Sequence, residues 1–284
     1  MTRSLALTLL ISLSYSILIS QSKRMDESVY DSWNTIEEVQ ISNNGDWVSY
    51  VIKPGKGNST LYLYNTRTEK EIFFDRSGNA QFDPDNEFIA FKIHPDVDSI
   101  HTLKLNKTKK DDLPGDSLAI LNLLNESFDK IPSVKSYKLP KENGGVIAYQ
   151  LSKRSIKEDS TLVKEEGKEN GTQLFVRDMR NQKVYNYDFV KNYKWSEKNN
   201  RLLIHSSGSD SIRNDLIFLL DCESGNENEI QHEKGEYAGF SIDQDGNRVA
   251  FIADRDTTEA HARPLELFYW SESDNETKVL VNRD

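Results

Sequence analysis

Five segments share one pattern: an apolar residue leads into a polar turn, and the turn leads into alternating apolar residues. They are ISNNGDWVSYVI at 41–52, FDPDNEFIAFKI at 82–93, LPKENGGVIAYQL at 139–151, WSEKNNRLLIHSS at 195–207 and FSIDQDGNRVAFIA at 240–253. Alternation with a period of two predicts β-strands. The turns carry residues that tolerate a positive φ, namely Gly45, Asn86, Gly144, Asn199 or Asn200, and Gly246.

Each segment is followed by a second apolar strand, a polar turn and another strand, which is the pattern of a β-hairpin. The hairpins lie at 59–72, 171–187, 214–230 and 265–280, with a weaker one at 99–110. One unit is therefore a four-stranded meander, repeated roughly every 40 to 60 residues, as in β-propeller blades.

The repeat predicts an all-β fold: an open or truncated β-propeller of about five four-stranded blades, without an α/β-hydrolase domain. The predicted propeller covers 21–284, with blades at about 35–75, 80–110, 134–188, 190–232 and 238–281. One blade cannot bury both of its faces alone, so neighbouring blades must cover each other. A β-sandwich with a similar rhythm is the alternative.

The most apolar strands are expected to lie innermost, near the propeller axis, where small residues such as Ala90, Ala148 and Ala250 relieve crowding. These strands are Val48–Ile52, Phe88–Ile93, Val146–Leu151, Leu202–His205 and Val249–Ala253.

Two segments interrupt the repeat of strands and turns. Residues 106–134 include Leu118–Leu124, a candidate short helix, and the charged run at 153–170 is expected to be a solvated loop.

The first twenty residues read as a secretory signal peptide, with Arg3 before an apolar run from Leu5 to Ile19. This predicts a secreted or periplasmic protein without a membrane span after cleavage; an uncleaved anchor is the alternative. The net charge of −10 argues against a nucleic-acid partner. Cys222 is the only cysteine, so no internal disulfide forms, and we expect it to pack within a blade.

Three polar clusters are candidate ligand sites, and for each the simpler reading is structural. They are His94, Asp96, Asp98 and His101; Asp243, Asp245 and Gly246; and Asp254, Asp256, Glu259 and His261. The first reads as an inter-strand loop, the second as a turn and the third as a blade-edge loop. Four tryptophans are spread along the chain and are expected in blade packing: Trp33, Trp47, Trp195 and Trp270.

Several segments, taken in order, resemble the propeller of secreted prolyl-oligopeptidase-family serine peptidases of Bacteroidetes-type bacteria. They are VYDSWNTIEEVQISNNGDWVSYVIKPGKGNSTLYLYNT at 29–66, FDPDNEFIAFKI, KKDDLPGDSLAI at 109–120 and FIADRDTTEAHARPLELFYW at 251–270. Each of these motifs, taken alone, also occurs in TolB-like and WD-repeat-like propellers. The resemblance implies a propeller that limits peptide access to an α/β-hydrolase domain, whose serine lies on a G-x-S-x-G turn.

That turn is absent from the sequence, and SSGSD at 206–210 is the nearest serine and glycine cluster. We therefore assign no catalytic, cofactor-binding or metal-binding residue, and expect the chain to be part of a larger protein. Its expected partners are a peptide substrate or the missing hydrolase domain. Two alternatives stay open: a free-standing periplasmic TolB-like propeller that binds a protein, and a five-bladed carbohydrate-active enzyme with converging carboxylates.

Overall fold

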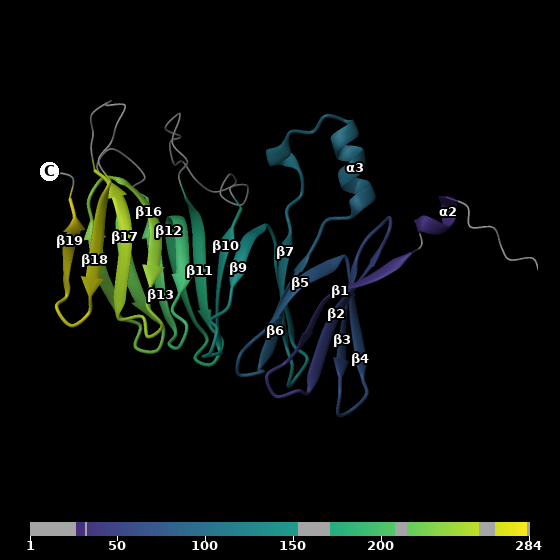
Figure 1. Cartoon of the computed structure of the whole chain (residues 1–284). Coiled ribbons are helices and arrows are strands. Elements are labelled where there is room, and N and C mark those ends of the chain that lie inside the picture. Colours follow the sequence, from purple (N-terminus) through teal and green to yellow (C-terminus); the bar gives the residue numbers. More distant parts are fainter. Residues whose placement is uncertain (1–26, 32, 153–170, 208–214, 256–264, 283–284) are drawn as a thin grey trace, which may run out of the picture.

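The computed structural model describes residues 27–31, 33–152, 171–207, 215–255 and 265–282. These residues form antiparallel sheets with few helices (Figure 1). No helix in the described part of the chain is long and apolar enough to cross a membrane. The predicted signal peptide and the charged run at 153–170 lie outside the described residues.

Three of the sheets are separate four-stranded meanders, in which strands consecutive in sequence are also neighbours in space. Blade 1 contains β1 (Asn34–Ile41), β2 (Trp47–Pro54), β3 (Thr60–Asn65) and β4 (Glu71–Asp75). Blade 2 contains β5 (Ser77–Phe82), β6 (Phe88–Ile93), β7 (Ser117–Asn122) and β8 (Phe128–Ile131). Blade 5 contains β16 (Glu236–Ile242), β17 (Arg248–Asp254), β18 (Glu266–Ser271) and β19 (Glu276–Val281). The short helix α2 (Glu27–Tyr30) precedes blade 1.

The remaining strands form one seven-stranded sheet that holds two blades joined by a shared strand. Its strands are β9 (Val134–Lys138), β10 (Val146–Leu151), β11 (Thr172–Asp178), β12 (Lys183–Trp195), β13 (Arg201–Ser206), β14 (Leu216–Asp221) and β15 (Glu227–His232). The first half of β12 pairs with β11 and completes blade 3. Its second half pairs with β13 and begins blade 4. Both pairings shift register near Val190, where β12 passes between blades.

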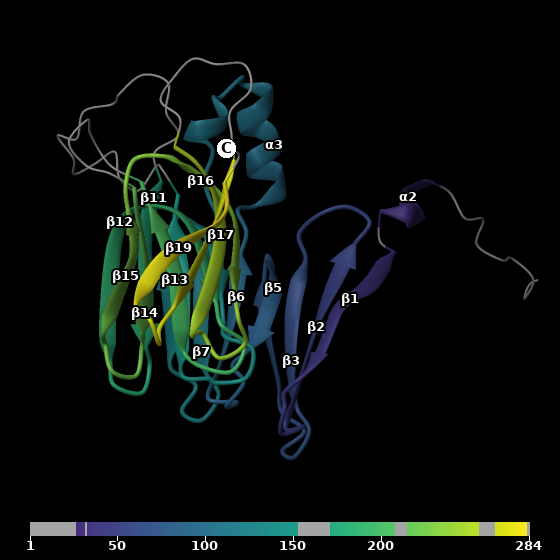
Figure 2. The ribbon, with the colours of Figure 1, turned by 60° about the vertical axis from the view of Figure 1, so that its left-hand side comes forward.

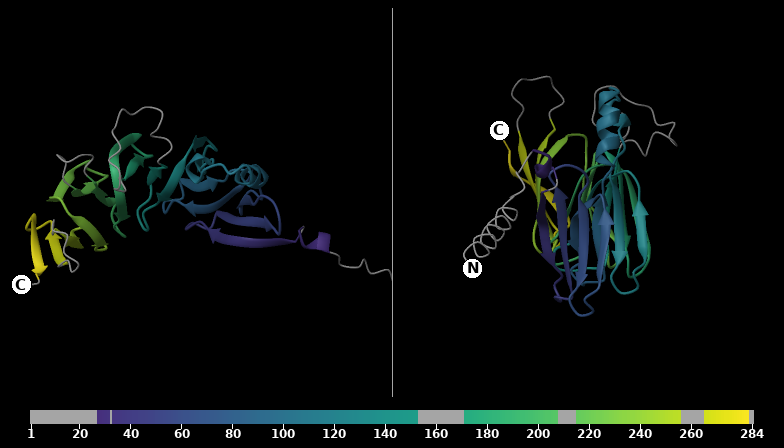
Figure 3. Two further views of the ribbon diagram at one scale, coloured as in Figure 1. Left: turned by 90° about the horizontal axis from the view of Figure 1, so that it is seen from above. Right: turned by 90° about the vertical axis from the view of Figure 1, so that its right-hand side faces the viewer.

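The five blades follow one another along an open arc, with blade 1 and blade 5 at opposite ends (Figures 1 and 3). Four separate hydrophobic clusters lie between consecutive blades, and each takes residues from both. A β-sandwich would instead have one core between two facing sheets. The prediction of a partial β-propeller of about five four-stranded blades in an open ring is confirmed, and the sandwich alternative is wrong.

The strands predicted to be innermost are instead the second strands of the blades: β2, β6, β10, β13 and β17. A second strand is flanked by strands on both edges, and in the middle of the arc by blades on both faces, so it carries the most buried side chains. The first strands lie on the inner side of the arc, where a groove exposes them. The most apolar strands are therefore those that other strands and blades cover on all sides, not those closest to the axis.

The second blade also departs from prediction between residues 97 and 124. In place of the first part of the expected hairpin at 99–110 there is the helix α3 (Val97–Leu105), whose N-terminus is capped by the side chain of Asp96. The candidate helix at Leu118–Leu124 is largely the strand β7, which is almost wholly buried. Blade 2 thus extends to Ile131, past the predicted end near residue 110, because α3 is an insertion before its third strand.

Hydrogen bonds between neighbouring blades join the turns that connect first and second strands. They run from Asn43 Nδ2 to Pro84 O (3.0 Å), from Gly145 N to Asp83 Oδ1 (2.7 Å), from Asn200 Nδ2 to Gly144 O (3.2 Å), from Glu197 N to Gln244 O (3.1 Å) and from Asn199 Nδ2 to Asp245 O (2.8 Å). Every pair of consecutive blades is linked in this way. The turns therefore form one polar rim that helps fix the angle between blades.

Positive φ occurs at three of the predicted turn positions, Gly45, Asn86 and Gly246. In the third turn it is Gly145, with φ of +78°, and not Gly144 that takes the left-handed conformation. Asn199 and Asn200 are not among the residues with positive φ. Asn200 is instead buried, with its side chain bonded across to blade 3.

We predict that Gly171→Ala destabilises the fold by about 2 to 3 kcal/mol, in the range of overpacked core substitutions. A Cβ at this position would overlap the backbone of Phe189 and Val190, where β12 leaves blade 3. The matched control is Gly115→Ala, whose Cβ would have no neighbour nearer than the Cα of Ser133 at 3.8 Å. Urea unfolding measures both; equal effects of the two substitutions would contradict the close approach.

We predict that Asp83 makes the stability of the fold depend on pH. Its pKa is raised from 3.8 to about 6, mainly by burial. Between about pH 4 and 6 the unfolded carboxyl ionises while the folded one stays protonated, so stability falls as pH rises through this window. Asp83→Asn removes that titration. Its unfolding free energy should rise relative to wild type by up to about 3 kcal/mol from pH 4 to 7. Unfolding curves with a constant difference across this range would refute the shift.

Candidate functional site

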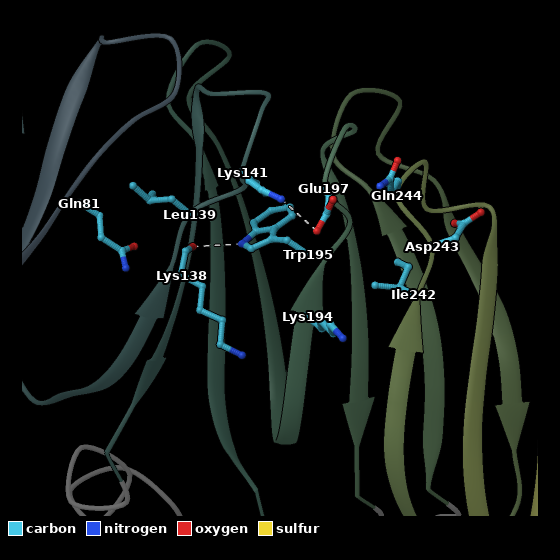
Figure 4. A pocket seen from close by; sticks show the side chains of 10 residues that line it. All are labelled: Gln81, Lys138, Leu139, Lys141, Lys194, Trp195, Glu197, Ile242, Asp243 and Gln244. Carbon is cyan, nitrogen blue, oxygen red and sulfur yellow. Dashed lines mark hydrogen bonds and ion pairs between the residues drawn. The ribbon is translucent and has the colours of Figure 1, made fainter. Parts of the chain in front are cut away.

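A groove of about 580 Å³ lies on the inner side of the arc, where the first strands of blades 2 to 5 run into their turns (Figure 4). Its lining residues are Gln81, Lys138, Leu139, Lys141, Lys194, Trp195, Glu197, Ile242, Asp243 and Gln244. Four blades contribute to it, so the groove exists only when the blades are held at their present angles. Sequence reasoning missed it, because its residues are spread over more than 160 positions.

Trp195 and Lys138 are tied together beside the groove. Trp195 is 8% exposed, and its indole Nε1 donates a hydrogen bond to the carbonyl oxygen of Lys138 at 3.1 Å. The Lys138 Nζ donates to the carbonyl oxygen of Tyr193 at 2.8 Å and lies 4.5 Å from the centre of the Tyr193 ring. Because its position is fixed by these contacts, the ammonium group of Lys138 is pre-oriented at the groove wall.

The groove contains lysines whose charge is not neutralised. Lys141 forms an ion pair with Glu197 at 3.2 Å. Within the described residues, no carboxylate forms an ion pair with Lys138 or Lys194, whose ammonium groups both lie below Trp195 in Figure 4. Partial burial, and then the charge of Lys194, lower the pKa of Lys138. In a chain of net charge −10, this local excess of positive charge favours an anionic group in the groove.

The groove does not have the arrangement that a carbohydrate-active enzyme needs. Two carboxylates line it, whereas hydrolysis of a glycosidic bond requires a free acid and a free base or nucleophile. Glu197 is paired with Lys141, and Asp243 accepts hydrogen bonds from the backbone N–H groups of Asn247 and Arg248. Both carboxylates thus take part in the structure of the turns. The lining residues include no serine, cysteine or histidine.

The structure separates the residues of the first predicted cluster. His94 Nδ1 lies 2.9 Å from Asp116 Oδ1, while Asp96 caps α3 by accepting from the backbone N–H of Ser99. His101 is exposed on α3. Hydrogen bonding to His94, followed by the nearby Lys92, lowers the pKa of Asp116 to about 2 against the effect of burial. The segment is a capped helix with a nearby ion pair, in place of the expected loop.

The second cluster is the turn that the sequence predicted. The Gly246 N–H donates to the carbonyl oxygen of Asp243 at 3.2 Å, which closes the turn between β16 and β17. In the third cluster, Asp254 is buried at the end of β17, and the other members lie outside the described residues. Among the described residues there is no group of three or more potential metal ligands.

Sequence reasoning also missed a buried pair in blade 4, on the side that packs against blade 5. His205 Nε2 lies 3.5 Å from Asp215 Oδ1, and Lys191 Nζ lies 3.6 Å from the same oxygen. Burial opposes ionisation of Asp215, but His205 and Lys191 hold its pKa below the ordinary value. The His205 ring also contacts the rings of Tyr237 and Phe240 in blade 5. The pair therefore contributes to blade packing and not to the groove.

Three of the four tryptophans pack between blades as predicted: Trp47, Trp195 and Trp270. Trp33 does not; it is 51% exposed and contacts the ring of Tyr30 edge-on at 4.9 Å. It precedes β1, outside the paired strands, so no blade covers it. Cys222 is buried in the cluster between blades 3 and 4, as predicted.

The sequence matches no known family model, and no curated protein matches it. Among solved structures it is similar to an acylaminoacyl peptidase from Pyrococcus horikoshii, with 14% identity and a TM-score of 0.45 over 90% of this chain. The chain spans 40% of the length of that peptidase.

Two further solved structures are also similar. The β-propeller domain of the Trilobed protease from Pyrococcus furiosus, described as having an open velcro topology, matches with 14% identity and a TM-score of 0.46 over 87% of this chain and 71% of its own. A putative TolB from Agrobacterium tumefaciens matches with 10% identity and a TM-score of 0.37, over 88% and 81%.

We predict that the Cys222 thiol does not react in the folded protein. Burial raises its pKa to about 12, so the thiolate that attacks disulfide reagents is scarce at neutral pH. An aromatic disulfide reagent should label less than one tenth of the thiol in native buffer and all of it in denaturant. Rapid labelling of the native protein would show that blades 3 and 4 separate readily.

Proposed function

We propose that this chain is the non-catalytic propeller portion of a prolyl-oligopeptidase-like serine peptidase and that it limits peptide access to a hydrolase domain carried elsewhere. The single observation that carries the proposal is the groove on the inner side of the arc, bordered by first strands. The blade motifs at 29–66 and 251–270, in family order, support the same assignment. In this proposal the protein is secreted or periplasmic, as the sequence of residues 1–20 predicts.

The groove fits an extended peptide better than a compact ligand. It crosses four blades, and polar groups alternate with the apolar surfaces of Leu139, Trp195 and Ile242. An extended peptide alternates side chains in the same way and leaves its backbone groups to be hydrogen-bonded. Lys138 and Lys194 would receive carboxylates of the peptide, either side chains or its C-terminus.

A second candidate function is a free-standing TolB-like propeller that binds a protein partner. The observation that favours it is the exposure of large apolar side chains on blade 1, including Ile36 at 66% and Phe73 at 62%. Exposed apolar surface of this kind is typical of protein contacts. The two candidates differ in where the ligand binds: in the groove, or at the end of the arc.

The test is titration of a fluorescein-labelled, unstructured peptide that contains proline and two glutamates. We expect binding, no hydrolysis, and about three- to tenfold weaker affinity in the double variant Lys138→Ala, Lys194→Ala, because two charge contacts are lost. The matched control, Lys104→Ala with Lys107→Ala, removes two exposed charges at and beyond the end of α3 and should leave affinity unchanged.

Equal losses in both double variants would show that net charge, and not the groove, holds the peptide. Cleavage of the peptide by the purified chain would contradict the non-catalytic role. A chain that fails to bind the peptide would overturn groove recognition and leave the partner-binding propeller as the better candidate.

A further inference from the structure

Blade 1 stands at one end of the arc, and no other described blade covers its outer sheet face (Figures 2 and 3). We call this surface face 1. Its side chains are those of Ile36, Ile41, Val48, Tyr50, Ile52, Tyr62, Tyr64 and Phe73, which point away from blade 2. Tyr50 stacks on Tyr62 at 5.2 Å, and Tyr62 contacts Phe73 at 6.1 Å. The surface is thus an ordered aromatic and aliphatic layer.

Face 1 repeats the pattern that other blades use to pack on the blade before them. Val48 and Tyr50 occupy the same places in β2 as Ile89 and Phe91 in β6. Both residues of β6 are fully buried against blade 1. Equivalent residues in β17 are likewise buried against blade 4. Face 1 therefore has the composition of a blade-to-blade contact whose other half is not among the described residues.

Blade 5 stands at the other end of the arc. We call its outer sheet face, which points away from blade 4, face 5. Its side chains are those of Arg248, Ala250, Ile252, Leu267, Tyr269, Lys278 and Val281. Ala250 stands where Ala90 and Ala148 stand in their blades, and both of those alanines are buried against the next blade. Face 5 is thus built to receive a following blade.

Polar residues on the two faces match as well. In blade 4, Arg201 reaches across to blade 5, where its Nη1 donates to Asn247 Oδ1 at 2.5 Å and to Glu272 Oε2 at 2.7 Å. Arg248 occupies the position of Arg201 one blade later; its side chain is 65% exposed and pairs with Asp243 of its own blade at 3.8 Å. In blade 1, Asp46 occupies the position of Asn247 and pairs with Arg67 at 2.5 Å. Across a contact between the two faces it would also face Arg248.

The outer strands offer a second charge match. Face 1 presents Glu71 on β4, and face 5 presents Lys278 on β19. Within the chain, ion pairs already join the outer parts of neighbouring blades, as between Arg177 and Asp129 at 3.0 Å. Lys278 has the place of Asp129 in its blade, and Glu71 lies beside the place of Arg177. Each also has a partner in its own blade, Asp274 for Lys278 and Tyr50 for Glu71. A contact between the faces would bring these opposite charges near each other.

We propose that copies of this chain associate head to tail, with face 5 of one copy packed on face 1 of the next. A second copy supplies an apolar sheet face to cover face 1 and charges opposite to Asp46 and Glu71, in the register used at the four contacts within the chain. Because the contact joins two different surfaces, it either closes into a ring or continues into longer assemblies. The proposal concerns the ends of the arc and does not depend on a peptide in the groove.

The test uses one substitution on each face: Phe73→Glu on face 1 and Ile252→Glu on face 5. Light scattering should give the wild-type chain at least twice the mass of one chain, and each variant the mass of one chain. The control Val184→Glu changes a 56% exposed residue of blade 3 and should keep the wild-type mass. Circular dichroism establishes that each variant is folded.

Mixing the two variants gives the decisive result. Phe73→Glu retains face 5 and Ile252→Glu retains face 1, so the mixture should form a one-to-one pair that stops at two copies. A mixture that stays monomeric, or one variant that still self-associates alone, would overturn head-to-tail packing. A wild-type chain that is monomeric at every concentration would overturn it as well. If Ile252→Glu is unfolded, Arg248→Glu takes its place, and Asp46→Arg should restore association to it.

Discussion

The fold depends on the need of every blade to cover two apolar faces. Each sheet places side chains alternately on opposite sides, and both sides of a second strand such as β6 are apolar and buried. One sheet alone would leave both faces in water, whereas five in series leave two uncovered faces in all. The four hydrophobic clusters between blades are the direct result. Stability is therefore shared among neighbour contacts and not concentrated in one centre.

Burial between blades sets how close they lie, and the polar rim of turns helps set their angle. Asp83 illustrates the conflict between these demands, since it is fully buried yet needed as an acceptor for the Gly145 N–H. Burying a carboxylate disfavours its charge, and the hydrogen bond offsets part of that cost. Because the rim residues Glu197 and Asp243 also border the groove, its width is set by the same hydrogen bonds that hold the blades together.

Much of the fold could be predicted from the sequence, since a strand buried on both faces requires an apolar run and each turn requires residues such as Gly45. The predictions that were wrong concern single elements of the fold. The segment Val97–Leu105 alternates enough to resemble a strand, but Asp96 caps it as a helix. The innermost strands were misassigned because apolarity reports coverage, and strands beside the groove are only partly covered. The groove could not be predicted, because Gln81 and Gln244 meet only through the curvature of the arc.

The groove and the two end faces are consequences of one arrangement. An arc of blades has an inner side where first strands are exposed and must be polar, which is why Lys138 and Lys194 can stand there. It also has two outer faces that no described residue covers, and on one of them Ile36 and Phe73 are exposed. Covering the ends would hold the outer blades in place and fix the groove between them. A ligand in the groove and a partner at the ends would therefore reinforce each other, because both act on the angle between blades.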